Sequence, residues 1–135
     1  MSYNYSPGTF NKFVQDNAEQ MFEIEDILSA MLPDNPEQLT YQLRRAESFY
    51  SNVTRMLSDA NGFLDVGEGA ALPPKGSGTE LDRKTAQVAA IAHVRAFRDR
   101  LDGVARAINL RLMLGMSLLK QHESERRGLG SGVGS

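Results

Sequence analysis

The sequence contains no cysteine, no tryptophan and only two histidines. Without cysteine the chain cannot form a disulfide, present a thiolate nucleophile or build a cysteine-based zinc site. Its first residues also lack the charged and then apolar pattern of a secretory leader, so we expect a reducing, cytoplasmic setting. With 135 residues, the chain is long enough for one domain that buries a substantial core.

Motifs of catalysis and cofactor binding are also missing. The glycines of residues 65–78 lack the spacing of a dinucleotide fingerprint or a P-loop, and the chain has no Glu-x-x-His and no Gly-x-Ser-x-Gly. His93 and His122 are 29 residues apart, too far for one metal site on a continuous helix. We therefore expect a protein that is not an enzyme and has no catalytic residue, no cofactor, no metal ion and no small-molecule substrate.

Apolar residues recur at alternating steps of three and four in two segments that a short turn separates. Thr9 stands where an N-cap would begin the first helix, and Asn35 followed by Pro36 is a typical start for the second. Seven-residue spacing of this kind is typical of a coiled-coil-like seam. The pattern predicts an antiparallel helical hairpin of residues about 10–32 and 36–64.

Two details qualify the hairpin. Asn17 falls on the apolar seam of the first helix, where it either finds a buried partner that fixes the register or lies exposed near a frayed start. In the second helix Phe49, Met56 and Phe63 repeat at sevens beside the seam and widen the apolar stripe. A stripe of that width predicts that three or more helices meet there.

The remaining part of the chain reads as a loop, a long helix and a tail. Residues 65–78 hold four glycines and two prolines, which predicts a mobile loop. No proline follows, so one helix is expected over about 80–125, roughly 70 Å long against about 40 Å for the second helix. We expect it either to bend near Gly103 or Gly115 or to project into another subunit. The tail, residues 128–135, is of low complexity and predicted to be disordered, which leaves residues 1–127 as a single domain.

Residues 108–119 are the most apolar stretch, because eight of these twelve residues are large and apolar and point in every helical direction. A helix that is apolar all round must be covered. The stretch is shorter than the roughly 20 residues that cross a bilayer and contains Arg111, so no membrane span is expected. We predict a partner interface formed by Leu110, Leu112, Met113, Leu114, Met116, Leu118 and Leu119.

Charge is unevenly distributed although the formal net charge is only −2. Residues 1–42 hold seven acidic residues against Lys12 alone, and the remainder carries a net charge of +4. Pairing between an acidic and a basic helix explains this asymmetry, and so does an attraction to nucleic acid. The residues that would contact nucleic acid are Lys84, Arg95, Arg98, Arg106 and Lys120.

Acidic residues interrupt that basic face. Asp102 is four residues from both Arg98 and Arg106, and Asp99 is four residues from Arg95. Ion pairs at this spacing are common on solvated helix faces, and the face has no interleaved aromatic residues on which bases would stack. Nucleic acid is therefore the secondary interpretation of the basic face.

Together these patterns predict an all-α protein: a helical hairpin plus one long C-terminal helix, forming a three-helix, coiled-coil-like bundle that is oligomeric. The functional hypothesis is a non-enzymatic structural or adaptor protein that assembles, with its own copies or on a larger complex, through the apolar end of the long helix. The alternative is an oligomeric accessory protein that binds nucleic acid through the basic face of that helix.

Overall fold

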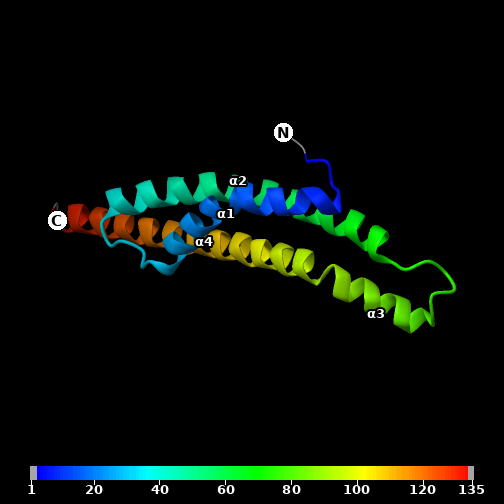
Figure 1. Ribbon diagram of the computed structural model, residues 1–135. Coiled ribbons are helices and arrows are strands. Elements are labelled where there is room, and N and C mark those ends of the chain that lie inside the picture. Colours follow the sequence, from blue (N-terminus) through cyan, green and yellow to red (C-terminus); the bar gives the residue numbers. More distant parts are fainter. Residues whose placement is uncertain (1–2, 134–135) are drawn as a thin grey trace.

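A computed structural model describes residues 3–133; the side chains of residues 7 and 129–133 lie outside that description. The described residues form four helices and no strand: α1 (Pro7–Ser29), α2 (Pro36–Ala71), α3 (Glu80–Ala90) and α4 (Ala92–Val133). The all-α prediction is confirmed. Helices α2 and α4 run side by side in opposite directions, and α1 packs across both (Figure 1).

Helix starts follow the capping residues of the sequence, with one difference. Asn35 caps α2, since its side-chain oxygen accepts the amide hydrogens of Glu37, at 2.9 Å, and Gln38, at 3.2 Å. Helix α1, however, begins at Pro7 rather than after Thr9. Ser6 is the N-cap, and its backbone amide donates to the Thr9 hydroxyl at 3.2 Å. The start moves back one turn because Pro7 is well suited to the first helical position.

The prediction of a loop over residues 65–78 is wrong for residues 65–71, because α2 continues to Ala71. Side chains of the following helices hold this extension. The Gln87 side-chain amide donates to the Glu68 carbonyl at 2.6 Å, and Arg95 pairs with the Glu68 carboxylate at 3.2 Å. These contacts outweigh the low helix propensity of two glycines.

The predicted continuous helix over 80–125 is broken at Ile91, and neither Gly103 nor Gly115 interrupts α4. Ile91 has φ −108° and ψ 8°, outside helical values, and its side chain is buried. Helix α3 stays against the end of α2, and Arg83 donates to the carbonyl of Pro73, just after that end, at 2.9 Å. Figure 1 shows the resulting change of direction between α3 and α4. The break lets α3 keep these contacts while α4 follows α2.

The other end of α4 also differs from the prediction. The helix continues to Val133, so residues 126–133 are helical, where a disordered tail was expected from residue 128. No proline stops the helix, and adding a residue to an existing helix is far easier than starting one. Residues 134–135 of the predicted tail lie outside the described part.

The core is richest in aromatic side chains at the end where α1 begins. Phe13 and Phe63 stack with ring centroids 5.1 Å apart, and Phe97 meets Phe13 edge-on at 5.6 Å. The N-terminal segment closes this cluster through Tyr5, whose ring contacts Phe63 at 5.0 Å and lies over Gly62. The widened stripe predicted for the second helix is confirmed at Met56 and Phe63, which are buried.

Asn17 takes neither of the two roles considered for it. Its side chain is half-buried and donates to the Phe13 carbonyl of the same helix at 2.8 Å. A side chain bonded to its own helix needs no partner across the seam. The seam of α1 therefore tolerates this polar residue without using it to select a register.

Candidate assembly surface

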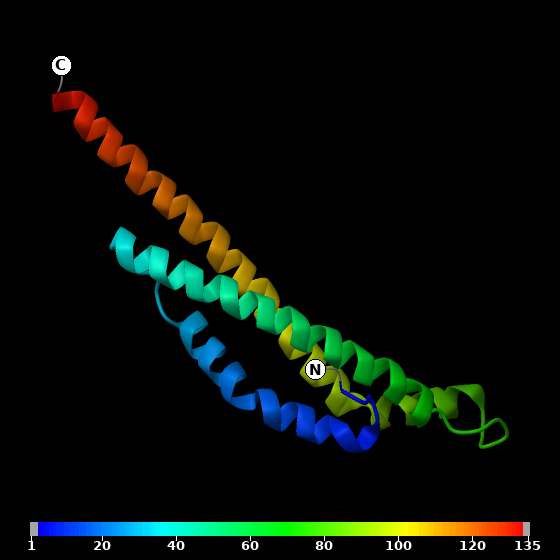
Figure 2. The same ribbon diagram turned by 90° about the horizontal axis from the view of Figure 1, so that it is seen from above.

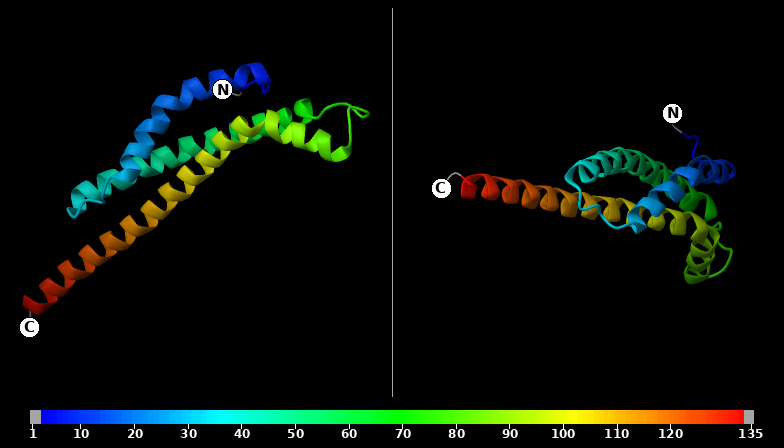
Figure 3. Two further views of the ribbon diagram at one scale, coloured as in Figure 1. Left: turned by 60° about the horizontal axis from the view of Figure 1, so that its bottom comes forward. Right: turned by 90° about the vertical axis from the view of Figure 1, so that its left-hand side faces the viewer.

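Helix α4 has an inner side that faces α2 and α1 and an outer side that faces solvent. Leu101, Val104 and Ile108 are buried on the inner side, as their spacing in the sequence predicts. Gly115 continues this side and is buried against Leu43 of α2. Beyond that contact the last part of α4 extends past the α1–α2 connection (Figures 2 and 3).

The seven residues predicted as an interface divide into two groups. Leu110, Met113, Leu114 and Met116 are exposed by 57%, 59%, 52% and 55%. The other three, Leu112, Leu118 and Leu119, are half-buried. Leu112 packs against the core of its own chain, so the structure separates it from the four exposed side chains.

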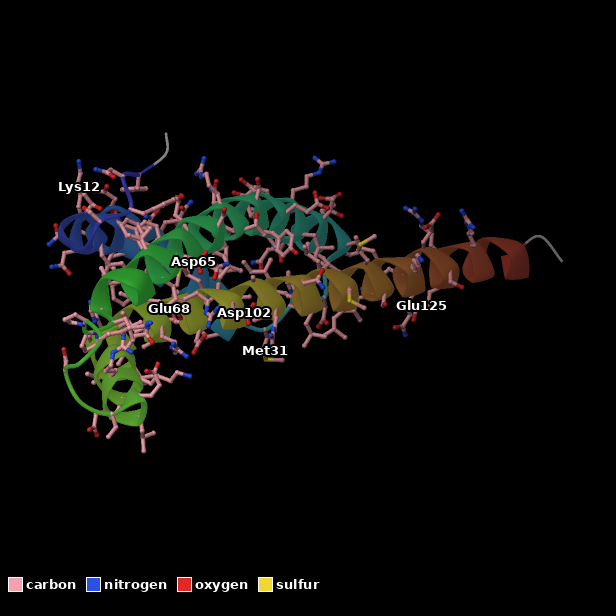
Figure 4. The ribbon with its side chains drawn as sticks, turned by 90° about the vertical axis from the view of Figure 1, so that its right-hand side faces the viewer. Lys12, Met31, Asp65, Glu68, Asp102 and Glu125 are labelled. Atoms are coloured by element: carbon pink, nitrogen blue, oxygen red, sulfur yellow. The ribbon has the colours of Figure 1, made fainter. Side chains whose placement is uncertain are left out.

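Two of the exposed side chains, Leu110 and Leu114, line a groove between α4 and the end of α1. Ala107, Leu110 and Leu114 line it from α4, and Leu28 and Leu32 line it from the end of α1 and the connection that follows. Met31 is 92% exposed in that connection and projects from it beside α4 (Figure 4). The apolar surface of α4 is therefore extended by residues that are distant in sequence.

Arg111 also lines this groove and fixes the relation of three helices. Its guanidinium donates to the Ala30 carbonyl at the end of α1, at 2.8 Å, and to the Gln42 side chain of α2, at 3.2 Å. Burial lowers the pKa of Arg111 below its ordinary value. In the sequence this residue only argued against a membrane span; its bonding role had no local signal, because both acceptors are distant in the chain.

The five predicted nucleic-acid residues are not brought together on one open face. Lys84 lies on α3, beyond the break at Ile91. Arg95 pairs with Glu68 rather than Asp99, and Arg98 pairs with Asp99 rather than Asp102, because α2 and the neighbouring residue offer nearer acceptors. The predicted pair of Arg106 with Asp102 is confirmed at 2.8 Å.

Acidic side chains thus neutralise three of the four predicted cations on α4. Lys120 is the fourth; it is exposed and belongs to none of the ion pairs found in the described part of the chain. A phosphate backbone is usually contacted by several unpaired cations in a row. The basic face of α4 does not provide that arrangement.

Among residues 3–133, no group of three or more acidic or histidine side chains is arranged to hold a metal ion. Nor does any helix of the described chain combine the length and the apolar character needed to cross a membrane. Comparisons with protein-family models, curated proteins and solved structures find no match for this chain.

Proposed function

We propose that this protein acts by association: a non-enzymatic structural or adaptor protein that binds its own copies or a larger complex through the outer side of α4. The supporting observation is that Leu110, Met113, Leu114 and Met116 are each more than half exposed within seven residues of one helix. Soluble monomers rarely expose a contiguous apolar patch of this kind unless it binds something. A cytoplasmic setting remains part of the proposal.

The groove beside α4 supports the same proposal. Leu28 and Leu32 add apolar surface from outside α4, so an incoming helix would contact two elements rather than a single ridge. Met31, which lies between Leu28 and Leu32 in the chain, adds a flexible exposed side chain, and Met113 and Met116 add further ones on other sides of α4. These features are typical of a surface that accepts a partner helix.

Light scattering on the wild type and on Leu114→Glu with Met116→Glu tests the proposal. We expect a multimeric wild type and a monomeric variant, because two carboxylates in a buried apolar contact are strongly unfavourable. Leu81→Glu with Val88→Glu is the matched control, since both residues are exposed apolar residues on α3. This control should remain multimeric. A soluble monomer for both the wild type and the α4 variant would contradict the proposal.

A further inference from the structure

The outer side of α4 carries a second seven-residue pattern, distinct from the inner one. From residue 103 its members follow alternating steps of four and three, all are exposed, and none is charged. We call this set the outer stripe: Gly103, Ala107, Leu110, Leu114, Ser117 and Gln121. An exposed side of a soluble helix normally carries charges, so an uncharged stripe over five turns needs an explanation.

We propose that a second copy of this chain covers the outer stripe, with the two α4 helices parallel and in register. This inference rests on the proposed function and specifies its partner. In a parallel, in-register pair, each residue of the stripe packs against the same residue of the other copy. Leu110 and Leu114 then pack against themselves, Gln121 can hydrogen-bond to Gln121, and Gly103 and Ala107 allow close approach. The outer stripe of one copy therefore matches the outer stripe of the other.

The charges that flank the C-terminal end of the outer stripe favour this orientation. At its N-terminal end the corresponding flanking residues are Arg106 and Arg111, and the Arg111 guanidinium is turned to Ala30 and Gln42 of its own chain. Lys120 directly precedes the stripe residue Gln121, and Glu125 follows Ser124, the next position of the same pattern. In a parallel pair, such flanking positions five residues apart meet across the interface. Lys120 of one copy therefore lies next to Glu125 of the other, twice in the dimer.

The opposite orientation creates a repulsive contact instead. In an antiparallel pair with Leu110 packed against Leu114, residues on the same flank of the stripe face each other across the interface. Arg106 of one copy would then lie opposite Lys120 of the other. Like charges so placed disfavour the pairing. The groove at Leu28 and Leu32 borders the stripe residues Ala107, Leu110 and Leu114, so the partner helix also covers the end of α1.

The absence of cysteine makes the register directly testable. Ser117→Cys and Ser124→Cys each place one thiol at an interface layer, where a parallel pair brings equivalent residues within the roughly 4.4–6.8 Å between Cα atoms that a disulfide needs. Under mild oxidation both variants should form covalent dimers at least about tenfold faster than Ser58→Cys, a control exposed on α2.

The possible outcomes separate this inference from the proposed function. A multimeric wild type, with no fast cross-linking of either variant but fast cross-linking in a mixture of Ala107→Cys and Ser117→Cys, would show an antiparallel pair. Multimers in which no stripe cysteine cross-links faster than the control would show that another surface is used. Either result overturns the inference and leaves association intact, whereas a monomeric wild type overturns both.

The ion pair provides an independent test. Lys120→Glu should weaken dimerisation several-fold, and adding Glu125→Lys should restore it, because the swap preserves the pair across a parallel interface. Dissociation constants from analytical ultracentrifugation measure both effects. A double variant no tighter than the single one would contradict the parallel arrangement.

Discussion

Gly115 of α4 lies against the buried side chain of Leu43 of α2, so closely that a Cβ atom at position 115 would overlap it. At this contact α2 and α4 approach each other, just before the last part of α4, which extends past the α1–α2 connection. A larger residue would have to push the two helices apart or move Leu43 from its place in the core. Gly103, in the same helix, has no atom within 4 Å of an added Cβ.

These two glycines give a matched pair of variants. Both substitutions to alanine gain the same intrinsic helix propensity, about 1 kcal/mol, so their difference isolates the cost of overpacking. We expect Gly115→Ala to be about 1–3 kcal/mol less stable than Gly103→Ala in urea unfolding, with both made in the Leu114→Glu, Met116→Glu background, where no second copy should cover Gly103. Equal stability of the two variants would show that Leu43 moves aside without cost.

Removing Arg111 should loosen the end of α1. Arg111→Ala loses two charge-assisted hydrogen bonds and a buried aliphatic stem, which predicts a loss of about 2–3 kcal/mol in the free energy of unfolding. Arg106→Ala is the control, because Arg106 is 81% exposed and pairs only at the surface; its effect should stay within about 0.5 kcal/mol. Urea unfolding followed by circular dichroism measures both changes. Similar values for the two would contradict the anchoring role.

Arg111→Lys distinguishes charge from geometry at the same position. An ammonium retains the charge but lacks the planar fork that reaches the Ala30 carbonyl and the Gln42 side chain together. The free energy of unfolding should fall between those of the wild type and Arg111→Ala. Amide hydrogen exchange in the last turn of α1 should be slowest in the wild type, faster in Arg111→Lys and fastest in Arg111→Ala.

The N-terminal segment should make stability fall in alkali. Tyr5 donates to Asp59 at 2.8 Å, and this hydrogen bond, followed by burial, raises the pKa of Tyr5 above its ordinary 10.0. A raised pKa in the folded state means that the stabilisation is present below pH 10 and is lost as the pH rises through the folded pKa. Tyr5→Phe should therefore flatten the decline in unfolding free energy above pH 10.

Tyr3 adds to the same effect, since burial and its hydrogen bond to Asp16 raise its pKa as well. The double variant Tyr3→Phe with Tyr5→Phe should show the shallowest dependence on pH. Urea unfolding between pH 8 and pH 11.5 gives the three curves. Parallel curves for the wild type and both variants would show that these phenols do not couple folding to pH.

Nucleic acid should be bound weakly, because ion pairs engage Arg95, Arg98 and Arg106. Fluorescence anisotropy with single-stranded and double-stranded DNA and RNA should show little binding even at low salt. Replacing these three arginines with alanine should then change nothing. Tight binding that falls steeply with salt and disappears in the triple variant would establish the alternative function.

The sequence by itself determined the all-helical class, the start of α2 and the inner face of α4. Asn35 and Pro36 marked the start of α2, and the spacing of Leu101, Val104 and Ile108 marked the side of α4 that is buried. These properties depend on capping bonds and on a period of 3.6 residues, both of which are local. The apolar end of α4 was also visible in the sequence, although which of its residues remain exposed was not.

Only the tertiary structure decided where α2 ends and where the third predicted helix breaks. Two glycines indicated a loop, yet contacts of Glu68 with Gln87 and Arg95 keep that segment helical, and the break falls at Ile91 instead of at a glycine. Likewise, Leu112 packs against the core and is not part of the candidate surface, whereas Leu28 and Leu32 contribute to that surface. Each outcome depends on residues distant in sequence, whose contacts outweigh local propensities of about 1 kcal/mol per residue.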